Sequence, residues 1–236
     1  MDKNEIKELG IVLSSTDSGE ADRLVTLLMP SLGKVVCKMR GVKKPKAKLA
    51  YASFPFNLGE YLLVKRGKSY IVINCNYVDN FSLLTADLNK YYAASGMLEA
   101  AKFLAREGSR ADELFLLVVK ALKELCYKEE VNILLVLTKF VYELLALSGF
   151  KITSEEIRDE KNCYFDFECG RLTTFLPEVG TQLSYSDALA LNAIITKPSE
   201  ELESTELKCS KNVLKLLVLF FEERVDEELK IIKKFL

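Results

Sequence analysis

The sequence of 236 residues contains no histidine and no tryptophan. Without imidazole the chain has no Ser-His-Asp or Cys-His triad, no histidine general base and no histidine metal ligand. Its apolar runs, such as 216–221, are far shorter than the roughly 20 residues that a membrane-spanning helix needs. The first residues are polar and charged, so we expect no secretory signal. These absences exclude many enzyme classes and predict a cytoplasmic protein with no membrane partner.

What the sequence does contain is enough apolar material for a packed core. Hydrophobic residues make up 49% of the chain and charged residues 28%, which excludes wholesale disorder. The length suits one large domain or two small ones. Six cysteines are spread along the chain, and without an export signal we expect reduced thiols, several of them buried.

The charge is unevenly distributed although the net charge is only -1. Residues 1–80 hold 13 basic and 8 acidic side chains, so the basic excess lies in the first third of the chain. The segment 34–48 contains no acidic residue and seven basic ones, namely Lys34, Lys38, Arg40, Lys43, Lys44, Lys46 and Lys48. Such asymmetry indicates a polyanionic partner for the basic part, although a solvated loop would have the same composition.

Short β-type runs separated by glycine and proline occupy the chain up to about residue 79. In the segment 34–40, Val35, Cys37 and Met39 alternate with basic residues, which is the period of a strand with one inward and one outward face. The alternation places Lys34, Lys38 and Arg40 outward. Five such runs predict a small antiparallel barrel over residues 1–80, at 10–13, 23–29, 34–40, 61–65 and 70–77.

Beyond residue 81 the apolar period changes to about 3.6, which predicts a helical domain over 81–236. Helices are expected from residue 88 to near Gly108, from about 109 to 125, over 131–147, from about 184, and in the last thirty residues. Ser109-x-x-Asp112 and Ser184-x-x-Asp187 are typical of helix N-termini. The segment at about 155–182 looks irregular and partly strand-like. The fold class is therefore β followed by α, with a small irregular insertion.

No cluster of chemistry-bearing residues predicts an active site. Cys163, Cys169 and Cys209 are spaced too poorly for a zinc site, which usually takes four thiolates or imidazoles in C-x₂₋₄-C pairs. We therefore predict no metal and no cofactor. Acidic pairs such as 155–156 and 222–223 are expected on solvated faces, so a hydrolase using paired carboxylates is disfavoured.

Positive charge on a barrel predicts nucleic-acid binding without catalysis. Lysine and arginine neutralise phosphates with counterion release, and exposed aromatic rings can stack on unpaired bases. Aromatic candidates are Tyr51, Phe54, Phe56, Tyr61 and Tyr70, of which at least half are expected to fill the barrel. The predicted phosphate-binding residues are Lys34, Lys38, Arg40, Lys43, Lys44, Lys46, Lys48, Lys65, Arg66 and Lys68, with Arg23 as a weaker candidate. These observations do not choose between DNA and RNA.

Several of these motifs together resemble the N-terminal signature of the bacterial recombination mediator RecO family. The resemblance rests on the order and spacing of 10–13 (GIVL), 19–26 (GEADRLVT), 33–35 (GKV) and 41–46 (GVKKPK). It implies an oligonucleotide/oligosaccharide-binding (OB) fold followed by a helical domain, which in many members carries a four-cysteine zinc finger. Here that region is degenerate, with only Cys163 and Cys169, and Ala47 stands where the basic loop of the family often has serine.

The resemblance also implies a function and partners. It implies binding of single-stranded and double-stranded DNA, annealing of complementary strands, and a nucleoid-associated role in repair. The implied partners are RecR, the C-terminal tail of the single-stranded-DNA-binding protein SSB, and in some bacteria RecF, in loading the RecA recombinase onto SSB-coated DNA. The alternatives are an RNA-binding OB protein and a protein-interaction adaptor whose basic segment is merely a soluble loop.

Overall fold

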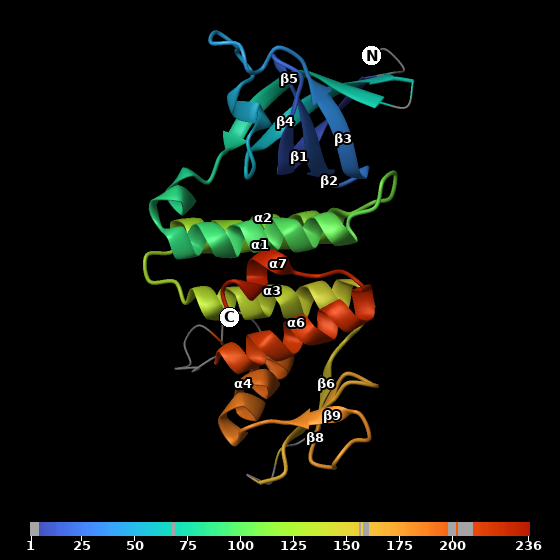
Figure 1. The fold of residues 1–236 in the computed structure, drawn as a ribbon, viewed down its shortest axis with the longest axis vertical. Helices are drawn as coiled ribbons and strands as arrows, with labels where there is room; N and C mark the ends of the chain where they lie inside the picture. The colour runs from blue at the N-terminus through green and yellow to red at the C-terminus, as the bar shows by residue number, and fades with distance from the viewer. Residues whose placement is uncertain (1–4, 68, 156, 158–160, 198–201, 203–209) are drawn as a thin grey trace. The chain divides into compact units, whose positions relative to one another are not determined.

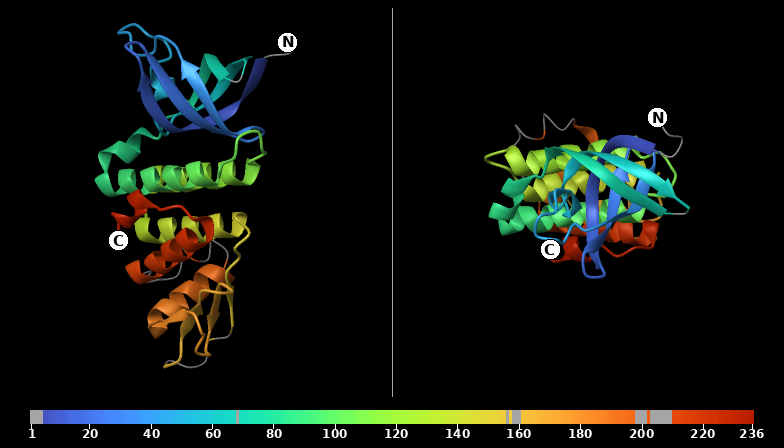
Figure 2. Two further views of the ribbon diagram at one scale, coloured as in Figure 1. Left: turned by 45° about the vertical axis from the view of Figure 1, so that its right-hand side comes forward. Right: turned by 90° about the horizontal axis from the view of Figure 1, so that it is seen from above.

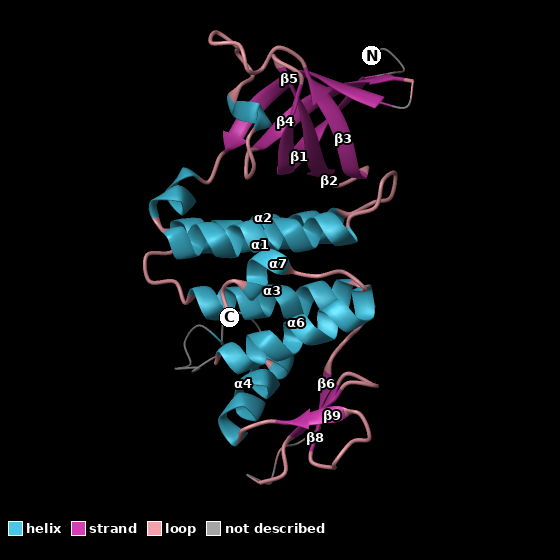
Figure 3. Cartoon of the chain, viewed as in Figure 1, coloured by secondary structure: helices cyan, strands magenta, loops and turns pink. Residues whose placement is uncertain are grey.

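The structure is a computed structural model that describes residues 5–67, 69–155, 157, 161–197, 202 and 210–236. It divides into two compact units, Met1–Lys128 and Glu129–Leu236, and each is considered by itself. Figure 1 labels the elements along the chain, and Figure 3 shows the strands gathered in a barrel and in one small sheet.

The first unit begins with a closed five-stranded barrel, as predicted (Figure 1, Figure 2). Its strands follow the order β1-β2-β3-β5-β4, which is OB-fold-like. Neighbouring strands are antiparallel except β3 and β5, which pair in parallel through Cys37–Tyr70 and Lys38–Ile71. The strands are β1 (Glu5–Ser18), β2 (Asp22–Met29), β3 (Gly33–Met39), β4 (Leu58–Arg66) and β5 (Ser69–Asp79).

The inward face of β3 confirms the predicted alternation. Val35, Cys37 and Met39 are buried in the barrel core, and this burial raises the pKa of the Cys37 thiol to about 12. Tyr61 is also fully buried there. Its hydroxyl donates to the carbonyl of Ala52 at 2.9 Å and accepts from the Asn57 side chain at 2.8 Å, so this buried phenol has its hydrogen bonds.

The turn between β2 and β3 is fixed by backbone contacts with a loop that follows the first long helix. Gly33 has a φ of +66°, and a Cβ atom there would collide with the carbonyl oxygens of Arg106 and Ser109. The Lys34 amide donates to the Arg106 carbonyl at 3.0 Å. Glycine is therefore required at this position by both its backbone conformation and the close approach of the loop.

Two helices complete the first unit after the short 3₁₀ segments η1 (Tyr51–Ser53) and η2 (Ser82–Ala86). They are α1 (Leu88–Leu104) and α2 (Asp112–Tyr127), close to the predicted ranges. The barrel strands end at Asp79, next to the boundary predicted at residue 80, whereas the compact unit also includes α1 and α2. The predicted cap at Ser109 was wrong, because the N-cap residue of α2 is Ala111.

The second unit combines helices with a small sheet. Among its described residues the helices are α3 (Ile133–Leu147), α4 (Tyr185–Thr196), α6 (Lys211–Val225) and α7 (Lys230–Lys233). The segment predicted to be irregular forms a four-stranded sheet in the order β6-β8-β7-β9. Its strands are β6 (Thr153–Ser154), β7 (Tyr164–Asp166), β8 (Arg171–Thr173) and β9 (Gly180–Gln182).

One aromatic contact joins this sheet to the helices. Phe165 of β7 is fully buried and packs edge-on against Phe220 of α6, with ring centroids 5.4 Å apart. Throughout the described ranges, no helix combines the length and the apolar character that crossing a membrane requires.

Candidate nucleic-acid interface

The outward face of β3 carries a row of alternate side chains. Lys34, Val36 and Lys38 point away from the core, and Arg40 follows directly after the strand. Alternate residues of a strand lie about 7 Å apart along one face. Lys34 and Lys38 are half-buried and Arg40 is exposed, so the row combines basic groups with one exposed apolar side chain, Val36.

Two aspartates beside the turn from β1 to β2 neutralise part of the predicted cationic track. Asp17 accepts from the Lys43 ammonium at 2.6 Å and from Arg23 Nε at 3.3 Å. Asp22 accepts from Lys38 Nζ at 3.0 Å and from the backbone amide of Gly41 at 2.8 Å. These contacts fix the start of the basic loop to the β1–β2 turn.

Both aspartates have a pKa below the ordinary value. The hydrogen bond from Lys43 is the main cause for Asp17, and the backbone hydrogen bond from Gly41 is the main cause for Asp22. Both carboxylates are therefore ionised at neutral pH, and a phosphate must compete with them for these cations.

The neighbouring cations of the loop have a different environment. Arg40 and three loop lysines are exposed, and no carboxylate within the described residues forms an ion pair with them; the lysines are Lys44, Lys46 and Lys48. They are the strongest candidates for phosphate contacts, because binding a phosphate there breaks no existing ion pair.

Arg23 is mainly engaged within the protein. Beyond its pair with Asp17, Nη1 donates to Ser53 Oγ at 3.1 Å, and the guanidinium lies 4.4 Å from the centroid of the Phe54 ring. These contacts leave Arg23 less available to a phosphate.

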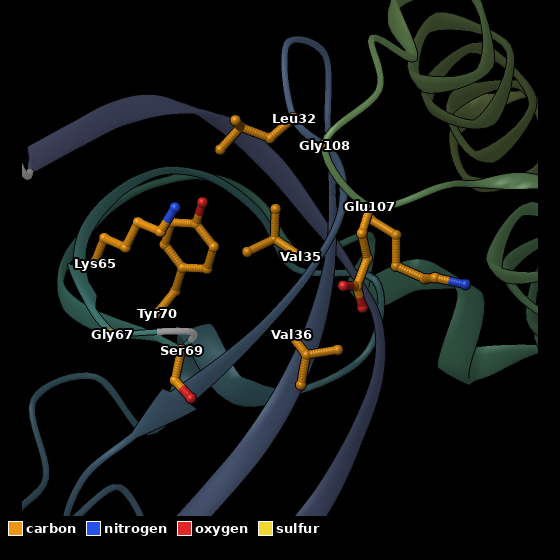
Figure 4. A pocket seen from close by; sticks show the side chains of 10 residues that line it. Leu32, Val35, Val36, Lys65, Gly67, Ser69, Tyr70, Glu107 and Gly108 are labelled. Carbon is orange, nitrogen blue, oxygen red and sulfur yellow. The ribbon is translucent and has the colours of Figure 1, made fainter.

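The remaining predicted cations lie away from the loop. Lys34 and Lys65 both line a hollow of about 490 Å³ between β3, the β4–β5 hairpin and the loop after α1 (Figure 4). Lys34 Nζ donates to the carbonyl of Lys102 at 3.2 Å, and Lys65 Nζ lies 5.9 Å from the centroid of the Tyr70 ring. Arg66 is exposed on the same hairpin, whereas Lys68 lies outside the described residues. The predicted cations thus form two groups, one at the basic loop and one at this hollow.

The predicted aromatic residues differ in burial. Phe56 and Tyr61 are buried and Tyr70 is half-buried, while Phe54 and Tyr51 are 50% and 38% exposed. Sequence reasoning missed Tyr77, which is exposed and meets Tyr51 edge-on at 6.1 Å between ring centroids. The alternation of the strand around Asn76 and Tyr77 was the sequence pattern that could have identified Tyr77 as exposed.

The cysteines of the small sheet do not fit a zinc site. Cys163 is buried, and the exposed Cys169 donates its Sγ hydrogen to Asp166 Oδ2 at 2.9 Å. The hydrogen bond to the Asp166 carboxylate raises the pKa of the Cys169 thiol. Cys209 lies outside the described residues, and within those residues no three His, Cys, Asp or Glu side chains are grouped to hold a metal ion.

Comparisons with known proteins assign the chain to a family. The model described as "Recombination protein O N terminal" matches residues 1–81, and "Recombination protein O C terminal" matches residues 85–231. The chain belongs to the recombination protein O family. The first match ends within two residues of the end of β5, so it coincides with the barrel.

Curated relatives of this RecO-family chain are named DNA repair protein RecO. One from Acetivibrio thermocellus is 27% identical over 95% of this chain and 93% of its own length. Another from Streptomyces coelicolor is 32% identical over 61% of each chain, and one from Desulfitobacterium hafniense is 35% identical over 48% of this chain and 41% of its own. Family membership supports a role in recombinational DNA repair.

Proposed function

We propose that this RecO-family protein is a non-enzymatic recombination mediator that binds single-stranded and double-stranded DNA through its barrel and anneals complementary strands. The proposal is carried by three exposed cations of the basic loop beside the row on β3 that form no ion pair with any carboxylate of the described residues, namely Lys44, Lys46 and Lys48. Phosphates displace counterions at such groups, which gives affinity without sequence preference. Neutralising two strands on one surface lowers their mutual repulsion, which annealing requires.

We infer that the protein is cytoplasmic and nucleoid-associated. We infer that the protein helps to load the recombinase onto SSB-coated DNA, together with RecR, the SSB C-terminal tail and in some bacteria RecF. Family membership supports this part of the proposal, and the basic loop supplies the DNA contacts that such loading needs.

The proposed function is tested by strand pairing. Complementary fluorescent oligonucleotides, free or coated with SSB, are mixed with the full chain and scored for duplex formation. Faster pairing of both preparations supports the proposal. Pairing no faster than without protein, together with no retarded DNA in a low-salt gel shift, would instead support the adaptor alternative. Tighter binding to RNA than to DNA of the same sequence would support the RNA-binding alternative, since only RNA presents a 2′-hydroxyl.

A further inference from the structure

The hollow beside β3 has a composition that phosphate binding alone does not explain. Besides Lys34 and Lys65 it is lined by an aromatic ring, Tyr70, and by an acidic side chain, Glu107. Figure 4 shows Tyr70 and Lys65 on one side, Glu107 on the other and Val35 between them. A carboxylate repels phosphate oxygens but accepts hydrogen bonds from donors on a base. The size is within the range of small-ligand sites and admits one nucleoside.

Tyr70 and Glu107, on opposite sides of the hollow, both belong to backbone segments that are held by pairing with neighbouring segments. Tyr70 pairs with Cys37 on β3 and with Lys65 on β4. Glu107 forms a β-bridge with Gly33. Backbone hydrogen bonds of 3.0 Å hold the residues on both sides of it: the Lys34 amide donates to the Arg106 carbonyl, and the Gly108 amide donates to the Leu32 carbonyl. Because the backbone that carries Glu107 is already ordered, binding a ligand costs little conformational entropy there, and the carboxylate can select a ligand by geometry.

We propose that this hollow receives one unpaired base of a bound single strand, preferring a base with an exocyclic amine. Tyr70 stacks on the base, Lys65 contacts an adjacent phosphate, and Glu107 accepts hydrogen bonds from the Watson–Crick edge. Guanine matches a carboxylate best, since its N1–H and N2–H₂ groups are adjacent donors, while thymine offers only N3–H. The inference rests on the proposed DNA binding and adds a base-reading subsite to it.

Binding of a base through its Watson–Crick edge affects annealing. A base held by Glu107 cannot pair with a complementary strand at the same time, so the subsite binds unpaired strands and releases the base when a duplex forms. The subsite thus discriminates between a strand awaiting its complement and the finished product, which phosphate contacts alone do not do.

The test uses the full chain and short oligothymidylates whose central base is thymine, guanine or hypoxanthine, with binding measured by fluorescence anisotropy. Hypoxanthine lacks only the exocyclic amine of guanine, so stacking is kept constant. We expect the guanine strand to bind at least about fivefold more tightly than the thymine strand, with hypoxanthine in between. Glu107→Gln should reduce the guanine preference to less than twofold. Glu113→Gln, which removes an exposed carboxylate from α2, should preserve it.

Tyr70→Leu gives a second readout, because it should weaken all three strands by a similar factor while leaving their ranking intact. Equal binding of the three strands by the unmodified protein would overturn the subsite and leave the proposed DNA binding standing. A guanine preference that survives Glu107→Gln would also overturn it. Failure of every strand to bind would overturn the proposed function and the subsite together. Glu107 is exposed, so its substitution keeps the test interpretable if Tyr70→Leu does not fold.

Discussion

Asp17 in the first unit and Asp187 in the second are carboxylates in opposite environments. In the first unit, Asp17 is 59% exposed and pairs with two cations at the barrel surface. In the second, Asp187 of α4 is only 6% exposed and is surrounded by neutral donors. It accepts from Ser184 Oγ at 2.7 Å, from Ser210 Oγ and from Asn212 Nδ2 at 3.3 Å. Exposed ion pairs contribute little to stability, whereas a buried, hydrogen-bonded charge contributes much. The ion pairs of Asp17 at the barrel surface can therefore be broken at little cost in stability. Asp187 in the second unit has a structural role.

The largest effect that this comparison predicts is at Asp187. Ser184 and Ser210 are the N-cap residues of α4 and α6, so one carboxylate fixes the start of both helices. Asp187→Ala removes three hydrogen bonds to a buried carboxylate, two of them from the helix-capping serines, and should lower the free energy of unfolding by about 3 kcal/mol. Urea unfolding followed by circular dichroism measures the change. If the free energy of unfolding fell by less than about 1 kcal/mol, Asp187 would contribute no more to stability than an exposed carboxylate such as Asp17, and the comparison would be wrong.

The glycine at the β2–β3 turn should give the next largest effect. Gly33→Ala places a Cβ atom against two carbonyl oxygens as well as at positive φ, so we expect a loss of about 2–3 kcal/mol. The matched control is Gly19→Ala, which has a φ of +72° but no atom within 4 Å of the added Cβ. The control should cost only about 1 kcal/mol. Equal losses would show that the approach of the loop after α1 contributes nothing.

Acid should weaken the second unit through Asp187. Burial by itself would raise its pKa, but the hydrogen bonds from Ser210, Ser184 and Asn212 together lower it below the ordinary value of 3.8. A pKa that is lower in the folded state stabilises the protein above about pH 4, and this contribution is lost as the pH falls through the folded pKa. The stability difference between the unmodified protein and Asp187→Asn should therefore shrink between pH 6 and pH 3. A difference that is constant over this range would contradict the account.

The smallest effect on stability is expected at Asp17, where the effect on binding is of greater interest. Asp17→Asn should leave the free energy of unfolding almost unchanged, since the pairs are exposed. It releases Lys43 and Arg23, so single-stranded DNA should bind about two- to fivefold more tightly at low salt. Glu60→Gln is the control, because Glu60 pairs with Lys7, which is outside both cation groups. An equal gain in the control would assign the effect to net charge alone.

Local patterns in the sequence were sufficient to predict the barrel and most helices. The alternation at Val35, Cys37 and Met39 identified the inward face of β3, and Ser184 caps α4 as expected. The same pattern failed at Ser109. There the Ala111 amide donates to the Pro30 carbonyl at 2.7 Å, and this pairing with a distant turn makes α2 begin later. Tertiary contacts overrode a local capping signal.

The candidate site was predictable only in part for the same reason. The segment 34–48 contains no acidic residue, yet Asp17 and Asp22 are brought to it by the β1–β2 turn and neutralise Lys43 and Lys38. Glu107 meets the hollow from a loop 37 residues beyond Tyr70 in the sequence. Such contacts come from segments distant in the sequence packing side by side, and they leave no local pattern.

The most direct test of the central claim is the salt dependence of single-stranded DNA binding. If about five cations contact phosphates, the logarithm of the binding constant should fall against the logarithm of salt concentration with a slope near −3.5. Combined replacement of Lys44, Lys46 and Lys48 by alanine should make the slope shallower by about 2. The control, alanine at the exposed Lys102, Lys120 and Lys123 of α1 and α2, should leave it unchanged. An unchanged slope in the loop variant would contradict the account and place the DNA elsewhere.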